Sequence, residues 1–421
     1  MSLSLIYHSL LSCFSAEKSG GWHPLLLCSV ADGSMAPEIV SMKKALFPLL
    51  FLLLLAGLFF SEIRSAVLSG LIMLDVMRYG RPPLLRYVSP DPMVSVVRYS
   101  GGGREMEADL YQARQGRAGP AIVLIHGVNE QGRSDPRIRW AAQMLCRVGF
   151  QVLVPDFQGF KSLRLRPSDI AEIADSFLYL SSRPDLSGAS RLGMAGFSYG
   201  AGPTVIAACD PRIRERVSFL ISFGGYYDLS NVTEFVTTGH YSYQGRSYIR
   251  PPNDYTRWIF LRYNLDLLQD EGDRRLLQEA EGWKVKGEER QLRRRLSPEG
   301  RAVYDLITNR DPAQVRRLLS QLPLRLQAYV QALSPSHYLK DLRAYCFIIH
   351  GVPDDFIPHT ESLRLADALS GPDRSRLVLL RIFTHVRPTL PPPTLSNLLF
   401  IYIPEGIKFF SLTYHLLRLA T

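Results

Sequence analysis

The sequence lacks the features that would place it in several large classes of proteins. Its five cysteines, Cys13, Cys28, Cys146, Cys209 and Cys346, are scattered and form no C-x-x-C pair. This distribution favours neither a zinc site nor a disulfide scaffold. The sequence also has no cluster of metal ligands and no glycine-rich phosphate-binding loop, so we expect neither a metal nor a cofactor.

The chain has a moderate share of charged residues and a net positive charge. Charged residues make up 21% of the chain, and the net charge of +10 comes mainly from arginine. No basic stripe with interleaved aromatic residues accompanies this excess, which argues against nucleic-acid binding. Attraction to an anionic membrane surface is the better interpretation. With 421 residues, 46% of them hydrophobic, the chain can bury a large core in one big domain or two smaller ones.

The N-terminal part contains one long apolar run. Residues 1–41 show no clear period and form an extension of uncertain nature. In the segment Met42–Phe60, two lysines precede about sixteen apolar residues, which is typical of a signal peptide or a membrane anchor. Arg64 stands where a cleavage site would need a small residue, so we predict an uncleaved signal anchor with its juxtamembrane segment over residues 42–80.

The apolar run is short for a membrane span, which needs about twenty residues. A second apolar patch, Ala66–Leu74, can extend it as an interfacial helix. The lysine pair favours a cytoplasmic N-terminus, which would place the rest of the chain outside the cytoplasm, in the cell envelope. Met35 and Met42 are alternative starts of the protein.

From about Val94 the pattern becomes that of an α/β protein. A hairpin is expected first, and then helical segments alternate with buried apolar runs, which indicates a mostly parallel sheet with helices on both faces. The runs are AIVLIHG, QVLVPDF, RLGMAGF, VSFLISFGG, AYCFIIHG and RLVLLRIF. We assign 90–230 and 337–421 to the two parts of this core and 231–336 to a helical cap inserted between them. The apolar C-terminal stretch is expected to be a last helix packed on the sheet, with interfacial membrane contact as the alternative.

The stretch Arg191–Ala208, RLGMAGFSYGAGPTVIAA, contains a serine between two glycines. An apolar strand precedes Ser198 and a helix-forming segment follows it. Such a sharp strand-to-helix turn lifts the serine Oγ clear of the sheet, and glycines permit the close approach of helix and strand. The sequence therefore predicts a nucleophile elbow at Ser198.

A serine nucleophile needs a base, which is usually a histidine oriented by a carboxylate. His385 follows the run RLVLLRIF, and Asp354 and Asp355 follow the run AYCFIIHG. All of these residues are expected at the carboxyl edge of the sheet, in the chain order serine, acid, histidine. Either aspartate can supply the carboxylate on this argument.

These motifs resemble those of α/β-hydrolase-fold enzymes, serine hydrolases with a helical cap that include esterases, lipases and dienelactone hydrolases. The segment HGVPDDFIP is similar to the family's acid segment, which places the acid on Asp354, with Asp355 second. The segment LIHGV resembles the oxyanion strand and implies that the backbone N–H groups of Val128 and Tyr199 form the oxyanion hole. The resemblance covers roughly Val94 to Pro388. In the segment PDFQGFKS, Gln158 and Lys161 depart from the family's usual arginine and glycine.

The resemblance implies acyl transfer by Ser198, Asp354 and His385 on a small-molecule or lipid ester, without a cofactor. The other interpretation is a non-catalytic envelope protein that uses the fold to bind a lipid or a partner. Among the remaining polar residues, His126, His350 and Asp156 are interpreted as structural. His359 stays open, as does His240, which can line a pocket from the cap.

Overall fold

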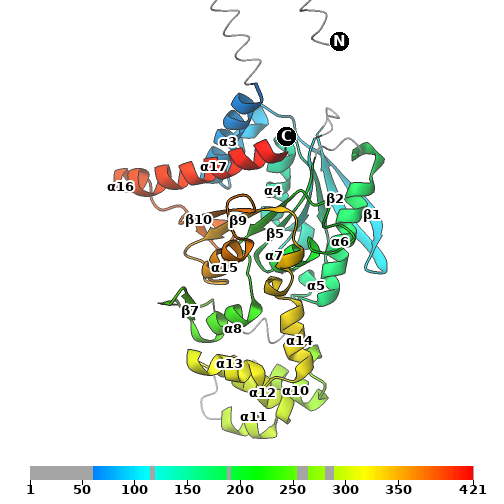
Figure 1. Ribbon diagram of the computed structural model, residues 1–421, viewed down its shortest axis with the longest axis vertical. Helices are drawn as coiled ribbons and strands as arrows, with labels where there is room; N and C mark the ends of the chain where they lie inside the picture. Colours follow the sequence, from blue (N-terminus) through cyan, green and yellow to red (C-terminus); the bar gives the residue numbers. More distant parts are fainter. Residues whose placement is uncertain (1–59, 114–118, 187–190, 254–263, 280–288, 421) are drawn as a thin grey trace, which may run out of the picture. The chain divides into compact units, whose positions relative to one another are not determined.

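The computed structural model describes residues 60–113, 119–186, 191–253, 264–279 and 289–420 (Figure 1). The chain divides into two units, Met1–Phe60 and Ser61–Thr421, and the second holds all described residues except Phe60. Its centre is one eight-stranded sheet in the order β1-β2-β4-β3-β5-β6-β9-β10. The strands are β1 Met93–Gly101, β2 Arg104–Gln112, β3 Ala121–Ile125, β4 Gln151–Pro155, β5 Leu192–Phe197, β6 Phe219–Phe223, β9 Tyr345–Gly351 and β10 Ser375–Leu380.

The sheet is parallel from β4 to β10, and β1 and β2 extend it as an antiparallel hairpin. The central strands are apolar because both of their faces are covered. In β3, Val123 and Ile125 point into one hydrophobic cluster, while Ile122 and Leu124 point into the other. The expected mostly parallel α/β sheet is therefore the observed one, and the carboxyl ends of β5, β9 and β10 lie at one edge.

Helices cover both faces of this sheet. The first cluster includes residues of α6 Pro167–Ser182, α7 Ala201–Ala207 and α15 Thr360–Leu369. The second includes residues of α3 Phe60–Met77, α4 Pro136–Arg147 and α17 Ile403–Ala420. Shorter elements are η1 Leu84–Tyr87, η2 Gly132–Ser134, α5 Gln158–Lys161, η3 Pro184–Leu186, η4 Ser198–Gly200, β11 Phe383–Thr384, β12 Arg387–Pro388, α16 Leu395–Asn397 and η9 Leu398–Tyr402.

Helix starts follow the local sequence. The side chain of Asp135 accepts a hydrogen bond from the N–H of Arg137, and Pro136 occupies the first turn of α4. In α6 the carboxylate of Asp169 lies inside the first turn. It accepts the N–H of Arg166 there, so the carboxylate satisfies a donor from within the helix.

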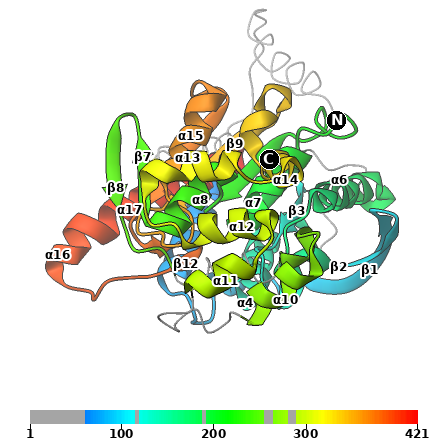
Figure 2. The ribbon, with the colours of Figure 1, turned by 90° about the horizontal axis from the view of Figure 1, so that it is seen from below.

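The described residues between β6 and β9 form a mainly helical insertion, which occupies the lower part of Figure 1 and lies in front of α7 when seen from below (Figure 2). Its elements are α8 Leu229–Thr238, β7 His240–Tyr243, β8 Arg246–Ile249, η5 Leu265–Leu267, α10 Glu271–Glu279, α11 Glu289–Arg295, α12 Pro298–Thr308, α13 Pro312–Ser320 and α14 Leu324–Ala332, with η7 Pro335–His337 and η8 Leu339–Asp341 leading back to the sheet. The β7–β8 hairpin was not expected from the sequence.

The predicted anchor falls largely outside the described residues, since its apolar core lies in 42–59. The described part of the segment forms α3, which packs on the sheet through Leu68 and Val76. No helix among the described residues is long and apolar enough to cross a membrane. The C-terminal stretch forms α17, which packs on the same face of the sheet as α3, as expected for a last helix.

Candidate active site

Ser198 follows directly after β5 and opens the turn into α7. Its φ is +57°, a left-handed conformation that is unusual for a residue with a side chain. Glycine is required on both sides of this turn because neighbouring backbone comes too close to leave room for a Cβ atom. A Cβ on Gly196 would come within 2.6 Å of the Cα of Ala201, and one on Gly200 within 2.3 Å of the carbonyl oxygen of His126. The turn thus has the geometry of the expected nucleophile elbow.

His385 stands at the first of two turn residues between β11 and β12, with a φ of +55°. Its Nε2 lies 2.6 Å from the Oγ of Ser198. The hairpin is pressed against the end of β9, because a Cβ on Gly351 would come within 2.2 Å of the carbonyl oxygen of Phe383. This contact brings the histidine to the strand end that Asp354 follows.

Asp354 is the carboxylate beside His385. Its Oδ2 lies 2.7 Å from the Nδ1 of His385, and its Oδ1 accepts hydrogen bonds from the N–H groups of Phe356 and Ile357 at 2.8 and 2.9 Å. Asp355, the second candidate in the sequence, points elsewhere, and its Oδ2 accepts a hydrogen bond from Asn253 at 3.2 Å. The structure therefore brings together Ser198, His385 and Asp354.

The environment keeps the Asp354 carboxylate charged. Burial would raise its pKa, but the charge of His385 and hydrogen bonds from His350 and His385 outweigh burial and hold the pKa well below its ordinary value. The Nε2 of His350 lies 3.2 Å from Oδ2 of Asp354 and 3.0 Å from the carbonyl oxygen of Ile357. His350, expected to bond loop backbone, thus also supports the acid.

The predicted oxyanion donors lie around the serine. Val128 and Tyr199 line the same cavity as Ser198 and His385. The backbone before Val128 passes close to the nucleophile, since a Cβ on Gly127 would lie 3.2 Å from the Cβ of Ser198. Tyr199 is in the first turn of a helix, where N–H groups lack partners inside the helix. The N–H of Val128 has no acceptor among the described residues.

Phe356 is a part of the site that the sequence did not reveal. Its ring stacks on the imidazole of His385, with centroids 4.8 Å apart and planes 24° apart. Its carbonyl oxygen also accepts a hydrogen bond from the hydroxyl of Tyr199 at 3.3 Å. No sequence pattern predicts this contact, because the stacking depends on how the loop after β9 packs against the hairpin after β10.

The remaining polar residues lie outside this arrangement. Asp156 pairs with Lys161 at 2.8 Å, a structural contact as expected. His126 accepts the N–H of Phe157, and burial lowers its pKa. Burial likewise lowers the pKa of His359 to about 4. His240, considered as a possible pocket residue, lies in β7 and lines neither described cavity. The described residues contain no group of three or more metal-ligating side chains.

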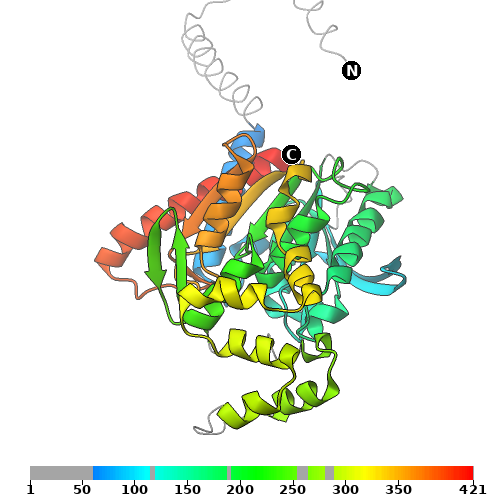
Figure 3. The ribbon, with the colours of Figure 1, turned by 60° about the horizontal axis from the view of Figure 1, so that its bottom comes forward.

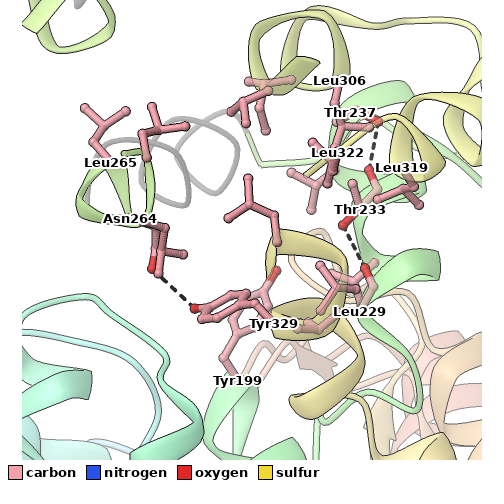
Figure 4. Close-up of a pocket in the computed structure, with 18 residues that line it drawn as sticks. Tyr199, Leu229, Thr233, Thr237, Asn264, Leu265, Leu306, Leu319, Leu322 and Tyr329 are labelled. Atoms are coloured by element: carbon pink, nitrogen blue, oxygen red, sulfur yellow. Dashed lines mark hydrogen bonds between the residues drawn. The ribbon is translucent and has the colours of Figure 1, made fainter. Parts of the chain in front are cut away.

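A second, apolar cavity adjoins the first (Figure 4). It holds about 900 Å³ of empty space, part of it open to solvent, beside Tyr199 and between α8 and other helices of the insertion. Most of its lining is aliphatic, including residues of α8, η5, α12 and α14. Tyr199 and Asn264 line both cavities, so the residue after the serine separates them.

Taken with the fold, these positions define a class. A mostly parallel sheet, a left-handed serine after its fifth strand, and an acid and a histidine after two later strands are the arrangement of the α/β-hydrolase fold. The resemblance seen in the sequence is thus confirmed at the level of the fold.

The comparisons with known proteins found similarities that are partial or distant. No family model matches the chain. Two curated Mycobacterium tuberculosis proteins, each named "Putative phosphoribosyl transferase", are 32% identical over 115 residues, which is 26% of this chain and 25% of theirs. The chain therefore matches about a quarter of the length of these relatives.

Three similar solved structures are distant in sequence. An acylaminoacyl peptidase of Pyrococcus horikoshii is 13% identical, covering 77% of this chain and 41% of its own, with a TM-score of 0.44. The dienelactone hydrolase of Anabaena variabilis is 16% identical, covering 76% and 98%, with a TM-score of 0.39. Est1E of Butyrivibrio proteoclasticus is 16% identical, covering 77% and 98%, with a TM-score of 0.43. These likenesses carry no argument about substrate.

Proposed function

We propose that the protein is a serine hydrolase that cleaves a carboxylic ester through an acyl-enzyme. The observation that carries the proposal is the position of His385, whose two ring nitrogens lie 2.6 Å from Ser198 Oγ and 2.7 Å from Asp354 Oδ2. A nucleophile, a base and an orienting carboxylate in hydrogen-bonding contact are what acyl transfer requires. A binding protein has no need for the three together.

The chemistry follows from these contacts. The Asp354 carboxylate accepts the N–H at Nδ1 of His385, so Nε2 is free to take the proton from Ser198 as the hydroxyl attacks the ester carbonyl. The N–H groups of Val128 and Tyr199 stabilise the oxyanion of the tetrahedral intermediate, and each such donor contributes about 10²–10³ in rate. His385 then protonates the leaving alcohol. Water activated by the same nitrogen releases the acyl group.

The apolar cavity supports an ester with an apolar acyl group. Its threonine hydroxyls are already used within α8, since Thr233 donates to the carbonyl of Leu229 at 2.7 Å and Thr237 donates to that of Thr233 at 2.8 Å. Asn264 is engaged by Tyr329 at 3.4 Å (Figure 4). A cavity whose polar groups are satisfied internally favours a hydrocarbon chain over a polar ligand.

We propose further that the protein is held at a membrane of the cell envelope by residues 42–59, with the hydrolase part outside the cytoplasm. The support is the sequence, in which Lys43 and Lys44 precede the apolar run. Fractionation tests this proposal, since release of the full-length protein by salt alone contradicts a spanning anchor.

The first experiment is labelling of the full chain with a fluorophosphonate probe, beside Ser198→Ala and His385→Ala. We expect labelling of the parent protein alone. If the folded parent protein stays unlabelled, the result contradicts the proposal of a serine hydrolase and favours that of a non-catalytic envelope protein. A series of p-nitrophenyl esters of increasing acyl length then tests the apolar cavity, where a preference for acetyl over longer chains argues against its role.

A further inference from the structure

The C-terminal region exposes large apolar side chains in a row. In the six residues from Leu395 to Phe400, four are large and apolar, and all four are exposed, Leu395 by 74% and Phe400 by 69%. The segment forms α16 and η9 and extends beyond the sheet (Figures 1 and 3). Single exposed apolar residues are ordinary, whereas a contiguous group marks a contact surface.

The exposed group continues along α17. Ile403, Ile407, Phe410 and Tyr414 recur at the spacing of one helix face, with Ile403 and Ile407 exposed and the two aromatic residues half-buried. The opposite side packs on the sheet through residues such as Phe409. The helix therefore has an exposed apolar stripe in addition to its sheet-facing side, next to a polar stripe that includes Lys408 and His415.

A second apolar stripe lies on the neighbouring helix α3. Ile63, Val67 and Leu74 share one face and are exposed, while Leu68 and Val76 pack on the sheet. The two helices run antiparallel and in contact. The guanidinium of Arg418 lies 2.7 Å from the carboxylate of Glu62 at one end. At the other end, a Cβ on Gly406 would lie 3.1 Å from Met77.

Both helices pack on the same face of the sheet, so their exposed stripes point away from it together. We call this surface the α3–α17 face. It consists of Ile63, Val67, Leu74, Leu395, Leu398, Leu399, Phe400, Ile403 and Ile407.

Acidic side chains are withdrawn from the α3–α17 face. Asp75 is buried and accepts the N–H groups of Leu84 and Leu85. Glu405 is fully buried and pairs with bases, its Oε1 lying 2.9 Å from the Nζ of Lys408. Glu62 pairs with Arg418. Glu62 and Glu405 are thus paired with bases and Asp75 is buried, which weakens the repulsion of these carboxylates from an anionic lipid surface.

We propose that the α3–α17 face lies on a lipid bilayer and docks the folded unit there. The chain itself supplies the reason for choosing lipid over another occupant, because the apolar run of residues 45–60 leads directly into α3. At about 1.5 Å per residue, Val67 follows Phe60 by only about 10 Å along the helix. An exposed apolar helix face on a protein with a net positive charge is typical of binding at a membrane interface.

The test uses the full chain, labelled at single positions with an environment-sensitive fluorophore. Cysteine is introduced at Phe400, Ile407 or Leu324 after replacement of Cys13 and Cys28 by serine, since Cys146, Cys209 and Cys346 are buried. Leu324 is the control because it is 82% exposed on the helical insertion. Vesicles of phosphatidylcholine and phosphatidylglycerol are added, with or without spin-labelled lipid.

We expect a blue shift and quenching by spin-labelled lipid at positions 400 and 407, and neither at position 324. No change at position 400 while the protein sediments with the vesicles overturns the proposal, because binding then involves only other segments. These readouts do not depend on hydrolysis, so Ser198→Ala in the same background separates failure of docking from failure of the proposed enzyme activity.

A second measurement distinguishes lipid from another copy of the chain. Phe400→Ser is expected to weaken vesicle partitioning at least about tenfold, since a buried large side chain contributes about 1.5–3 kcal/mol, while Leu324→Ser leaves it unchanged. Sedimentation velocity without vesicles is the companion assay. A dimer that dissociates in Phe400→Ser overturns the proposal and makes the surface an interface between copies.

Discussion

The ring of Phe356 lies against the imidazole of His385, nearly parallel to it and 4.8 Å away between centroids. The backbone N–H of the same residue donates to Asp354. Phe356 thus contacts both residues: its ring packs on the face of the His385 imidazole, and its backbone N–H donates to the Asp354 carboxylate. It is a positioning residue, since it touches the base and not the reacting atoms.

We expect Phe356→Leu to lower kcat about 2–10-fold with little change in KM. The backbone hydrogen bond persists in this variant, and the lost aromatic contact is worth about 0.5–1.5 kcal/mol. Steady-state hydrolysis of a p-nitrophenyl ester measures the effect. Phe410→Leu is the matched control, because Phe410 also stacks on an aromatic ring, that of Tyr414, at a distance from the site. Equal losses in both variants argue against positioning.

The two adjacent aspartates are expected to differ sharply. Asp354→Asn removes the carboxylate that orients His385 and should cost about 10³–10⁴ in kcat, as in related triads. Asp355→Asn changes a contact with Asn253 and should stay within about tenfold of the parent. Rates of fluorophosphonate labelling give the same comparison independently of substrate choice. Similar losses at both positions contradict the assignment of Asp354.

Glu361 should contribute a fall in stability with rising pH, while the buried His126 and the partly buried His359, whose pKa values are lowered, contribute an opposite rise below about pH 6.5. This buried carboxylate on α15 accepts the N–H groups of Tyr227 and Asp228 at the entrance to the insertion, and burial raises its pKa to about 7. The folded state therefore binds more protons than the unfolded state between about pH 4.5 and 7. The contribution of this group is fully present below pH 4.5 and is lost as the pH rises through 7.

The measurement is urea unfolding at several pH values between 5 and 8. Glu361→Gln should flatten the decline in the free energy of unfolding relative to the parent. Part of the slope is expected to remain, because burial also raises the pKa of Asp169 to about 7. Glu105→Gln is the control, since that side chain is 70% exposed. An unchanged slope in Glu361→Gln refutes this account.

Two glycines should respond to alanine in opposite directions. Gly200→Ala places a methyl group 2.3 Å from the backbone of His126 and is expected to destabilise the fold by about 1–3 kcal/mol. Gly70→Ala lies inside α3, with nothing within 4 Å of the new methyl group. It should gain about 0.5–1 kcal/mol from helix propensity. Chemical denaturation of both variants provides the comparison, and a loss at Gly70 contradicts the placement of α3.

Filling the apolar cavity should change acyl-chain preference. Leu306→Trp adds volume among the lining side chains and is expected to lower kcat/KM for long acyl chains by about tenfold or more. Hydrolysis of the acetyl ester should stay within about twofold. The control Leu324→Trp, on an exposed position, is expected to alter neither. A uniform loss across the ester series contradicts an acyl-binding role.

The sequence predicts most of the core because its signals are local. The run AIVLI is apolar throughout, and this is the pattern of a strand covered on both faces. The hairpin β7–β8 was missed although a signal exists, since Gln244 and Gly245 form a two-residue turn with φ values of +48° and +76°. Such an X-Gly pair between alternating aromatic residues is a hairpin pattern.

The candidate site was accessible from sequence for a different reason. Ser198, Asp354 and His385 each follow a buried strand, and parallel strands bring their carboxyl ends together. The strand ends alone left Asp354 and Asp355 open, because the choice depends on the backbone turn that directs one carboxylate to the histidine. The resemblance to the family's acid segment favoured Asp354, and this is the carboxylate that lies beside His385. Phe356 and Glu361 were missed for a similar reason, since their partners lie on loops that are distant in the chain.

The position of Tyr199 between two cavities has a kinetic consequence. In the acyl-enzyme that we propose, the acyl chain would occupy the apolar cavity, while the alcohol would depart through the cavity lined by His385, here called the open side. The deacylating water enters the space that the alcohol has left. An added alcohol that fits this space competes with water, so the protein would transfer acyl groups between alcohols, and the ratio of transfer to hydrolysis would report the size of the open side.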